Sequence, residues 1–192
     1  MTAVPRLVVG ISGASGAIYG VRLLEALAAR QDVETHLVVS AGAHETIRYE
    51  TGRDVDDLER LAAAVYEPGD LAATIASGSF LTAGMVVAPC SMGTLSRVAT
   101  SANDNLIGRA ADVHLKERRP LVLVVRESPL HAGHLRLMLD VTHAGAVVLP
   151  ASPGFYHRPT TIEELVDHVV GKTLDVLGLT DHDLFPRWQG HK

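Results

Sequence analysis

Aromatic residues are scarce in this sequence, and cysteine is nearly absent. Phe, Trp and Tyr make up 4% of the 192 residues, whereas hydrophobic residues as a whole make up 47%. The core must therefore be built from Ala, Val, Leu and Ile, and the 17 Gly favour close packing of the backbone. The single Cys excludes an internal disulfide framework and is typical of a reducing compartment such as the cytoplasm.

A basic surface and a long apolar run are also missing. The net charge of -5 argues against nucleic-acid binding, which needs a positive footprint. The first apolar run, Leu7–Ile11, is too short for a signal peptide or a membrane span. His131 and His134 are three residues apart, but two ligands without a third do not make a zinc site. We expect a soluble cytoplasmic protein with no membrane, nucleic-acid or metal requirement.

Short apolar runs alternate with segments of helical spacing along the chain. Five runs predict buried strands: Leu7–Ile11, His36–Val39, Met85–Ala88, Leu121–Val125 and Ala146–Leu149. Helices are predicted at Ala17–Ala29, Leu95–Ala99 and Leu135–Thr142. This alternation indicates an α/β fold, namely a three-layer, Rossmann-like or flavodoxin-like doubly wound parallel sheet.

The chain length of 192 residues fits one domain. An irregular stretch, Glu67–Thr82, is expected to form a surface loop. The polar segment 181–192 is expected to be a tail, and it contains Phe185 and Trp188, which an isolated tail would rarely expose. We therefore predict that the tail packs on the core of its own subunit or on a neighbouring subunit.

The clearest local motif is the turn Gly10–Ala17, with the sequence GISGASGA, between the first strand and the first helix. Small residues let the backbone approach a ligand, and a helix N-terminus offers free N–H groups to an anion. Ser12 and Ser15 add hydroxyl groups, although a serine here can also act as a helix cap. The turn is not a G-x-G-x-x-G fingerprint, because Ser12 stands where the second Gly belongs.

Two further turns of small residues follow the second and third predicted strands. The second ends at Val39-Ser40-Ala41, without the acid that nicotinamide enzymes place there for the ribose, which argues against NAD. The third ends at Pro89–Thr94 (PCSMGT). Ligands bind beyond the carboxyl ends of strands in open α/β sheets, so the three turns predict one binding site. Cys90 in the third turn is interpreted as a structural thiol, because nothing near it indicates activation.

Charged residues surround the fourth predicted strand. Arg109 and Lys116 precede it, and Arg126-Glu127 terminates it. Most such charges are simply solvated, but Arg and Glu at the carboxyl end of a strand suit anion binding and proton transfer. After the fifth strand, two prolines and a glycine in residues 153–159 predict a rigid loop that could aim Tyr156 into a site or pack it against the loop itself.

Taken together, these motifs resemble the UbiX flavin prenyltransferases. The resemblance rests on GISGASGAIYGVRLLEAL, on Pro89-Cys90-Ser91-x-Gly-Thr-Leu-Ser, on the segment from Ala110 to Leu123, on Arg126-Glu127 and on Pro-Gly-Phe-Tyr156-His. It extends from about residue 6 to the tail. The related cysteine decarboxylases share the fold, but their PASANT-type motif is replaced here by Thr100–Asn105.

The resemblance implies a set of site residues. Those expected to hold FMN are Gly13, Ala14, Ser15, Ser40, Ser91, Met92, Gly93, Thr94 and Arg126. Those expected to bind the phosphate of dimethylallyl phosphate are Arg109, Lys116, Tyr156 and Lys172. Catalytic roles are implied for Glu50, Lys116, Glu127 and Ser15. Some relatives carry Arg where this chain has Lys172, and Lys cannot make the same forked contact. Glu50 is selected by the resemblance alone.

The implied reaction joins the dimethylallyl group to N5 and C6 of reduced FMN and gives prenylated FMN. The family delivers this product to a UbiD-type decarboxylase and forms large homo-oligomers, often dodecamers, with sites at subunit contacts. Two alternatives stay open: an FMN-dependent cysteine decarboxylase-like oxidoreductase, and a non-catalytic flavin carrier subunit. Neither the choice between monophosphate and pyrophosphate donors nor the acceptor of the C6 proton follows from the sequence.

Overall fold

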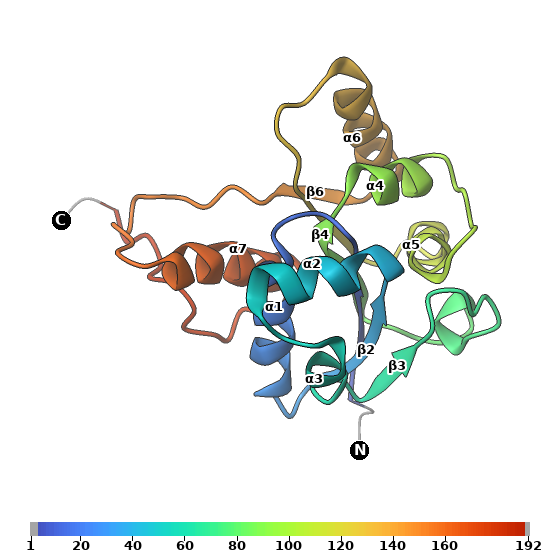
Figure 1. Ribbon diagram of the computed structural model, residues 1–192, viewed down its shortest axis with the longest axis horizontal. Helices are drawn as coiled ribbons and strands as arrows, with labels where there is room; N and C mark the ends of the chain where they lie inside the picture. The colour runs from blue at the N-terminus through green and yellow to red at the C-terminus, as the bar shows by residue number, and fades with distance from the viewer. Residues whose placement is uncertain (1–3, 191–192) are drawn as a thin grey trace.

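The computed structural model describes residues 4–190, and within them six parallel strands form one sheet with helices on both faces (Figure 1). The strands are β1 (Arg6–Ile11), β2 (Glu34–Val39), β3 (Ala64–Tyr66), β4 (Gly84–Cys90), β5 (Leu121–Val125) and β6 (Val147–Pro150). The helices are α1 (Ala17–Ala28), α2 (Ala41–Thr51), α3 (Val55–Glu59), α4 (Met92–Ala99), α5 (Leu106–Lys116), α6 (Ala132–Ala144) and α7 (Ile162–Val176), with a 3-10 turn, η1, at Thr74–Ala76.

The strand order is β3-β2-β1-β4-β5-β6. The chain therefore begins in the middle of the sheet, builds outward to β3, and then crosses back to β4 to build the other half. The switch point lies between β1 and β4, where ligands bind in doubly wound sheets. The predicted fold class is confirmed.

All five predicted strands are present with nearly the predicted bounds. The apolar side chains of β1, β2, β4 and β5 are buried on both faces of the sheet, whereas those of the edge strand β6 are partly exposed. The sixth strand, β3, was missed. It has three residues at the edge of the sheet, and its side chains are partly exposed. The apolar run at residues 61–66 (LAAAVY) is mostly alanine, which does not favour a strand, and only its last three residues form β3.

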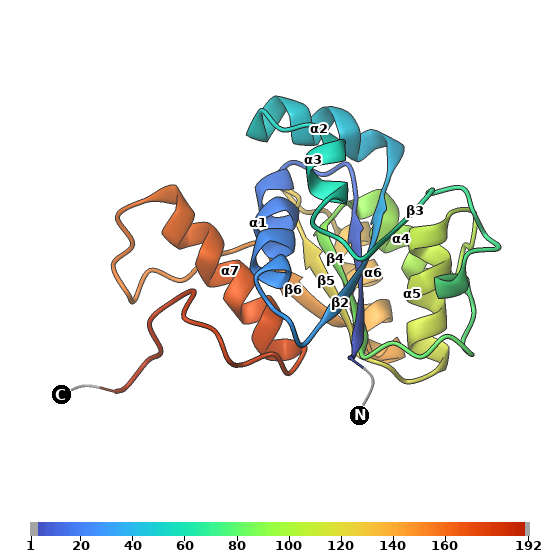
Figure 2. The same ribbon diagram turned by 90° about the horizontal axis from the view of Figure 1, so that it is seen from below.

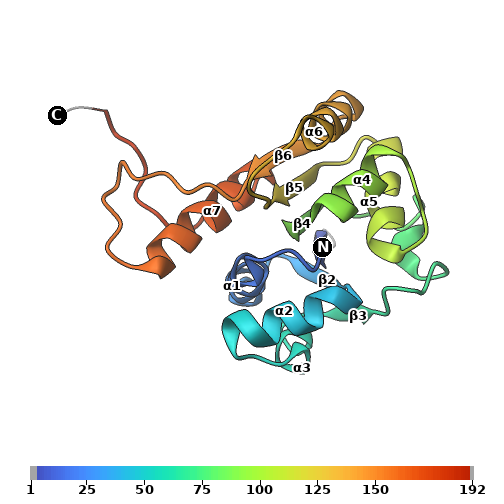
Figure 3. The same ribbon diagram turned by 45° about the horizontal axis from the view of Figure 1, so that its top comes forward.

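The two faces of the sheet carry separate cores. Side chains from α1, α3 and α7 pack on one face, and side chains from α4, α5, α6 and η1 pack on the other. Figures 2 and 3 show α5 and α7 on opposite sides of the strands. Any residue on α5 is therefore separated from any residue on α7 by the sheet of its own subunit.

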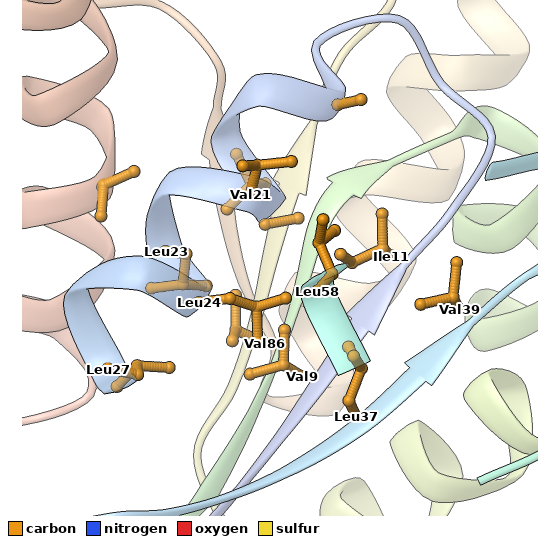
Figure 4. Close-up of a cluster of buried hydrophobic side chains, with 14 of the residues drawn as sticks. Val9, Ile11, Val21, Leu23, Leu24, Leu27, Leu37, Val39, Leu58 and Val86 are labelled. Atoms are coloured by element: carbon orange, nitrogen blue, oxygen red, sulfur yellow. The ribbon is translucent and has the colours of Figure 1, made fainter. Parts of the chain in front are cut away.

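Helix α1 covers the switch point, as its apolar spacing predicts. Val21, Leu24 and Leu27 recur at helical spacing on the face of α1 that lies toward the sheet. They belong to the same apolar cluster as Val9 of β1 and Val86 of β4 (Figure 4). This packing brings the backbone at the start of α1 to the carboxyl edge of the sheet.

The segment Glu67–Thr82 is irregular, but the prediction of a surface loop was wrong for its middle part. Ile75 is buried, and the backbone oxygen of Pro68 accepts a hydrogen bond from Leu106 N at 2.8 Å. Apolar contacts with α5 hold η1 in place. The segment therefore forms part of the second core.

The tail packs on α7 through Phe185 and Arg187, and the last two residues of the predicted tail, 191 and 192, lie outside the described part. The Phe185 ring fills a notch at Gly171, where a Cβ would lie 2.5 Å from Phe185 Cδ1. Arg187 Nη1 donates to Asp175 Oδ2 at 2.6 Å. Trp188 remains 60% exposed.

Within residues 4–190, no helix combines the length and the apolar character needed to cross a bilayer.

The close contact between α1 and β4 predicts an unusual response to a glycine substitution. A Cβ at Gly20 would lie 2.4 Å from the backbone oxygen of Ala88. Alanine normally stabilises a helix by about 1 kcal/mol relative to glycine. Here we expect Gly20→Ala to lower the stability by about 1–3 kcal/mol, because the carbonyl cannot move without disturbing the sheet.

The measurement is the thermal unfolding midpoint, with Gly69→Ala as the matched control because a Cβ at that position would have no atom within 4 Å. The control should unfold at the wild-type temperature. A Gly20→Ala protein as stable as wild type would contradict this helix–strand contact.

Candidate functional site

The turns after β1, β2, β4 and β5 meet at the carboxyl edge of the sheet. Ser12 ties two of them together, because its Oγ donates to the Pro89 oxygen at 2.8 Å and accepts from Ser91 N at 2.8 Å. Ser12 is 1% exposed, so its hydroxyl serves the structure and is not offered to a ligand, contrary to the sequence interpretation.

The first turn also lies very close to the start of α2. A Cβ at Gly13 would be 2.8 Å from the backbone carbon of Gly42, so only glycine fits at position 13. Gly42 follows Ser40 by two residues and was not selected from the sequence, although a second small residue after a strand is a usable signal. The backbones of the two turns therefore pack against each other beside β1 and β2, and we refer to this pair of turns as the cradle.

The serines of the second and third turns differ in what their hydroxyls do. Both Ser40 and Ser91 are N-cap residues, of α2 and α4 respectively. Ser91 Oγ accepts from Thr94 N at 3.2 Å and bonds to Thr94 Oγ1 at 3.1 Å. Ser40 makes no side-chain cap hydrogen bond, so its hydroxyl is available. Met92 and Gly93 form the first turn of α4 between them.

Glu50 proves to be part of the first turn. Its Oε2 accepts hydrogen bonds from Gly16 N and Ala17 N, both at 2.8 Å. The N-cap of α1 is Gly16 in the left-handed conformation, and no side chain of the turn caps the helix. The expectation of free N–H groups was therefore wrong for these two donors, because a carboxylate from α2 takes them. The N–H groups of Gly13, Ala14 and Ser15 lie upstream.

Arg126 approaches the same turn from β5. Its backbone N–H donates to Cys90 O at 3.2 Å, and its Cγ lies 3.8 Å from the position that a Cβ on Gly16 would take. Burial raises the pKa of Tyr19 nearby, and the Arg126 charge opposes that rise. Glu127 is exposed and accepts from Ser128 N at 2.9 Å. A cation and a carboxylate thus stand beside the cradle.

Cys90 lies beneath the third turn and is fully buried. Burial raises the pKa of its thiol to about 12. A thiol of that pKa carries almost no thiolate at neutral pH and is a poor nucleophile. This supports the interpretation of Cys90 as a structural residue.

Arg109 and Lys116 lie on α5, away from the cradle. Arg109 Nε donates to Ala76 O at 3.1 Å, and Nη1 donates to Asp112 Oδ2 at 3.4 Å. Lys116 pairs with Glu117. Both cations line an open hollow of about 430 Å³ together with Gly78 and its neighbours. The lining is polar, and it also includes Glu117, so each cation already has a carboxylate partner from its own chain. An incoming anion would compete with these carboxylates for the two cations.

Tyr156 and Lys172 lie together near α7. The Tyr156 hydroxyl bonds to His168 Nε2 at 3.2 Å, and Lys172 Nζ lies 3.5 Å from Asp175 Oδ2. Tyr156 therefore packs against α7 and not only against its own loop. His168, a single histidine on an apolar helix face, was not selected from the sequence.

The sheet separates the four residues that were predicted to bind phosphate. Arg109 and Lys116 lie on the α5 face, whereas Lys172 and the partner of Tyr156 lie on the α7 face (Figure 1). One subunit therefore does not bring the four together. The part of the chain that the structure describes also contains no group of three His, Cys, Asp or Glu residues placed to hold a metal.

The Glu50 contact predicts a loss of flavin binding on mutation. Glu50→Ala leaves two N–H groups without their charged acceptor, which costs about 1.5–3 kcal/mol per bond to a charged group. We expect the Kd for FMN to rise at least about tenfold. The exposed Glu45→Ala on the same helix is the matched control. Fluorescence titration of FMN would measure both, and equal Kd values would contradict a role for Glu50 in shaping the turn.

The burial of Cys90 predicts slow alkylation. In the native protein at pH 8, iodoacetamide should label Cys90 far more slowly than a free thiol, because its pKa of about 12 suppresses the thiolate. Intact-protein mass measurement would follow the labelling, with urea-unfolded protein as the control. If native protein were labelled as fast as urea-unfolded protein, Cys90 would again be a candidate nucleophile.

Comparison with known proteins agrees with this geometry. A family model described as Flavoprotein matches residues 1–174. The flavin prenyltransferase UbiX of Thauera aromatica is 58% identical over 187 residues, which cover 97% of this chain and 95% of that protein.

Two solved structures are similar over nearly the whole chain. A crystal structure of AnUbiX (PadA1) in complex with FMN and dimethylallyl pyrophosphate superposes with a TM-score of 0.95 at 49% identity, covering 99% of this chain and all of that one. A dodecameric FMN-dependent UbiX-like decarboxylase from Escherichia coli O157:H7 superposes with a TM-score of 0.94 at 50% identity, covering 96% and 100%. By identity and coverage, this chain belongs to the UbiX flavin prenyltransferase family of flavoproteins.

Proposed function

We propose that this protein joins the dimethylallyl group of dimethylallyl phosphate to N5 and C6 of reduced FMN and releases prenylated FMN. The observation that carries this proposal is the glycine-lined cradle at the switch point, in a chain whose relatives at 49–58% identity are named flavin prenyltransferases. The chemistry needs a flavin held by small turns and a cationic site for the leaving phosphate.

The cradle suits FMN because its walls are backbone and small side chains. The residues that we propose to hold FMN are Gly13, Ala14, Ser15, Ser40, Ser91, Met92, Gly93, Thr94 and Arg126. The close packing of Gly13 on Gly42 keeps side chains out of this part of the cradle, and Arg126 supplies positive charge beside the turn. When bound, reduced FMN supplies the two nucleophilic atoms that receive the prenyl group.

The donor phosphate requires cations, because an allylic phosphate ionises readily only where the departing charge is stabilised. We propose that Arg109, Lys116, Tyr156 and Lys172 provide this site. Since the sheet separates them within one subunit, Arg109 and Lys116 of one subunit would meet Tyr156 and Lys172 of another. Arg109 and Lys116 line an open hollow, which a second subunit would be able to cover.

A homo-oligomer is therefore part of the proposal. The E. coli relative is dodecameric. Exposed apolar side chains on and beside α6, Leu130, Leu135 and Leu139, offer surface for subunit contacts. A site closed by two subunits would also exclude water, which protects an allylic cation from hydrolysis.

Acid–base roles are proposed for the carboxylates beside the cradle. Glu127 is exposed and close to Arg126, so it can accept the proton lost from the flavin ring. Glu50 shapes the turn through the Gly16 and Ala17 N–H groups and presents negative charge there. The Ser15 hydroxyl and the Lys116 ammonium complete the proposed catalytic set.

The alternative of a cysteine decarboxylase-like oxidoreductase is not favoured, because the relatives at this level of identity are named flavin prenyltransferases. A carrier subunit would bind FMN without changing it. Delivery of the product to a UbiD-type decarboxylase and a cytoplasmic location stay predictions.

The deciding experiment is anaerobic incubation of the purified protein with reduced FMN and dimethylallyl phosphate, followed by mass measurement of the extracted flavin. We expect a flavin heavier by one five-carbon prenyl unit, with and without a metal chelator. Parallel incubation with dimethylallyl pyrophosphate, the ligand of the AnUbiX structure, identifies the preferred donor. Unmodified FMN recovered from flavin-loaded protein would contradict the proposal.

Subunit complementation tests whether the site spans two chains. Arg109→Ala and Tyr156→Phe should each reduce prenylation about tenfold or more, because each removes a bond to a charged phosphate. When the two variants are co-expressed with different tags and isolated as mixed oligomers, some sites would regain both residues. Activity above that of either variant is expected, and a mixture no more active than its parents would place the whole site within one chain.

A further inference from the structure

His168 has both ring nitrogens in hydrogen bonds, although it lies on a largely apolar face of α7. The residue is 8% exposed. Gly154 N donates to its Nδ1 at 3.2 Å, and the Tyr156 hydroxyl lies 3.2 Å from its Nε2. The loop that carries Tyr156 is therefore attached to α7 at two points of a single imidazole ring.

The Gly154 contact determines where the imidazole proton resides. A backbone N–H can only donate, so Nδ1 must be an unprotonated acceptor. In the neutral ring the proton then sits on Nε2, and that N–H donates to the Tyr156 oxygen. The alternative tautomer would place two donors against each other at Nδ1.

This direction leaves the phenolic proton of Tyr156 unused. Among residues 4–190, the Tyr156 hydroxyl forms no second hydrogen bond, and its side chain is 48% exposed. The Arg187 guanidinium interacts electrostatically with Tyr156, and Lys172 lies one turn beyond His168 on α7. A hydroxyl that accepts from one side and donates to the other is suited to an anionic oxygen. If Tyr156 donated to His168 instead, its oxygen would face the anion with lone pairs.

We propose that His168 is a positioning residue, which holds the Tyr156 hydroxyl as an acceptor so that its proton points to the phosphate of the prenyl donor. This inference rests on the proposed function, in which Tyr156 binds that phosphate. No part of it requires His168 to touch the substrate.

Neighbouring side chains keep the His168 ring uncharged and fix its orientation. The His157 ring stacks on it with centroids 5.3 Å apart and planes 8° from parallel, and Phe185 of the tail packs against it at 5.0 Å. Burial lowers the pKa of His168, and the neighbouring His157 and Lys172 lower it further. The neutral ring is therefore the form present at neutral pH. The notch at Gly171 that seats Phe185 thus helps to hold His168 in place.

The test is a double-mutant cycle on the affinity for dimethylallyl phosphate, measured by titration of the assembled protein loaded with oxidised FMN, which cannot turn over. Tyr156→Phe should raise the Kd about tenfold, the effect of losing a bond to a charged group. His168→Asn keeps an acceptor for Gly154 N but does not reach Tyr156, so it should weaken binding by a similar factor. Because both changes remove one effect, the double variant should bind no more weakly than Tyr156→Phe alone.

Rescue separates positioning from folding. The longer side chain of His168→Gln restores an N–H donor within reach of Tyr156 and should bind close to wild type. His168→Leu, whose apolar side chain suits its α7 neighbours, serves as a second variant without either hydrogen bond and should behave as His168→Asn does. His143→Asn, an exposed histidine in the last turn of α6, is the control and should not change the Kd.

Each outcome decides the inference. Three results would each overturn it. The effects of the Tyr156 and His168 variants on the Kd could multiply in the double variant, His168→Gln could fail to restore binding, or Tyr156→Phe could bind like wild type. Failure of the proposed function has a different signature, since wild-type protein would then yield no prenylated flavin whatever the affinities of the variants.

Discussion

The site depends on one buried hydroxyl. Ser12 donates to the end of β4 and accepts from the turn beyond it, so the loops that follow β1 and β4 are held as one unit at the switch point. At a switch point the connections after the two neighbouring strands lead to opposite faces of the sheet, and here the Ser12 bridge joins them before they separate. The close approach of Gly13 to Gly42 and the cap that Glu50 places on α1 both build on this joined edge.

The sheet carries the proposed flavin site at its carboxyl edge, and it also lies between the residues of the proposed phosphate site. Its two faces carry separate cores, with α5 on one and α7 on the other. Arg109 and Lys116 are thereby kept apart from Tyr156 and Lys172. A fold of this kind can gather ligands along one edge, but it cannot join its two faces there, so the proposed phosphate site requires a second subunit.

Sequence analysis identified the elements whose signal is local. Five of the six strands were found because each is a short run of apolar residues, and the three turns were found because small residues follow such runs. The strand β3 was missed because it is short and half-exposed. Glu50 and His168 gave no local signal: one is a polar residue on a helix, the other a lone histidine among valines.

The sequence by itself determined the fold class and the family, because each of these depends on residues that are close together along the chain. Only the tertiary structure decided that Glu50 caps α1, that Ser12 is structural, and that His168 bonds to Tyr156. These contacts join residues that are distant along the chain or on separate elements. Their geometry follows from how α2, β4 and α7 pack on the sheet, which no spacing within a motif encodes.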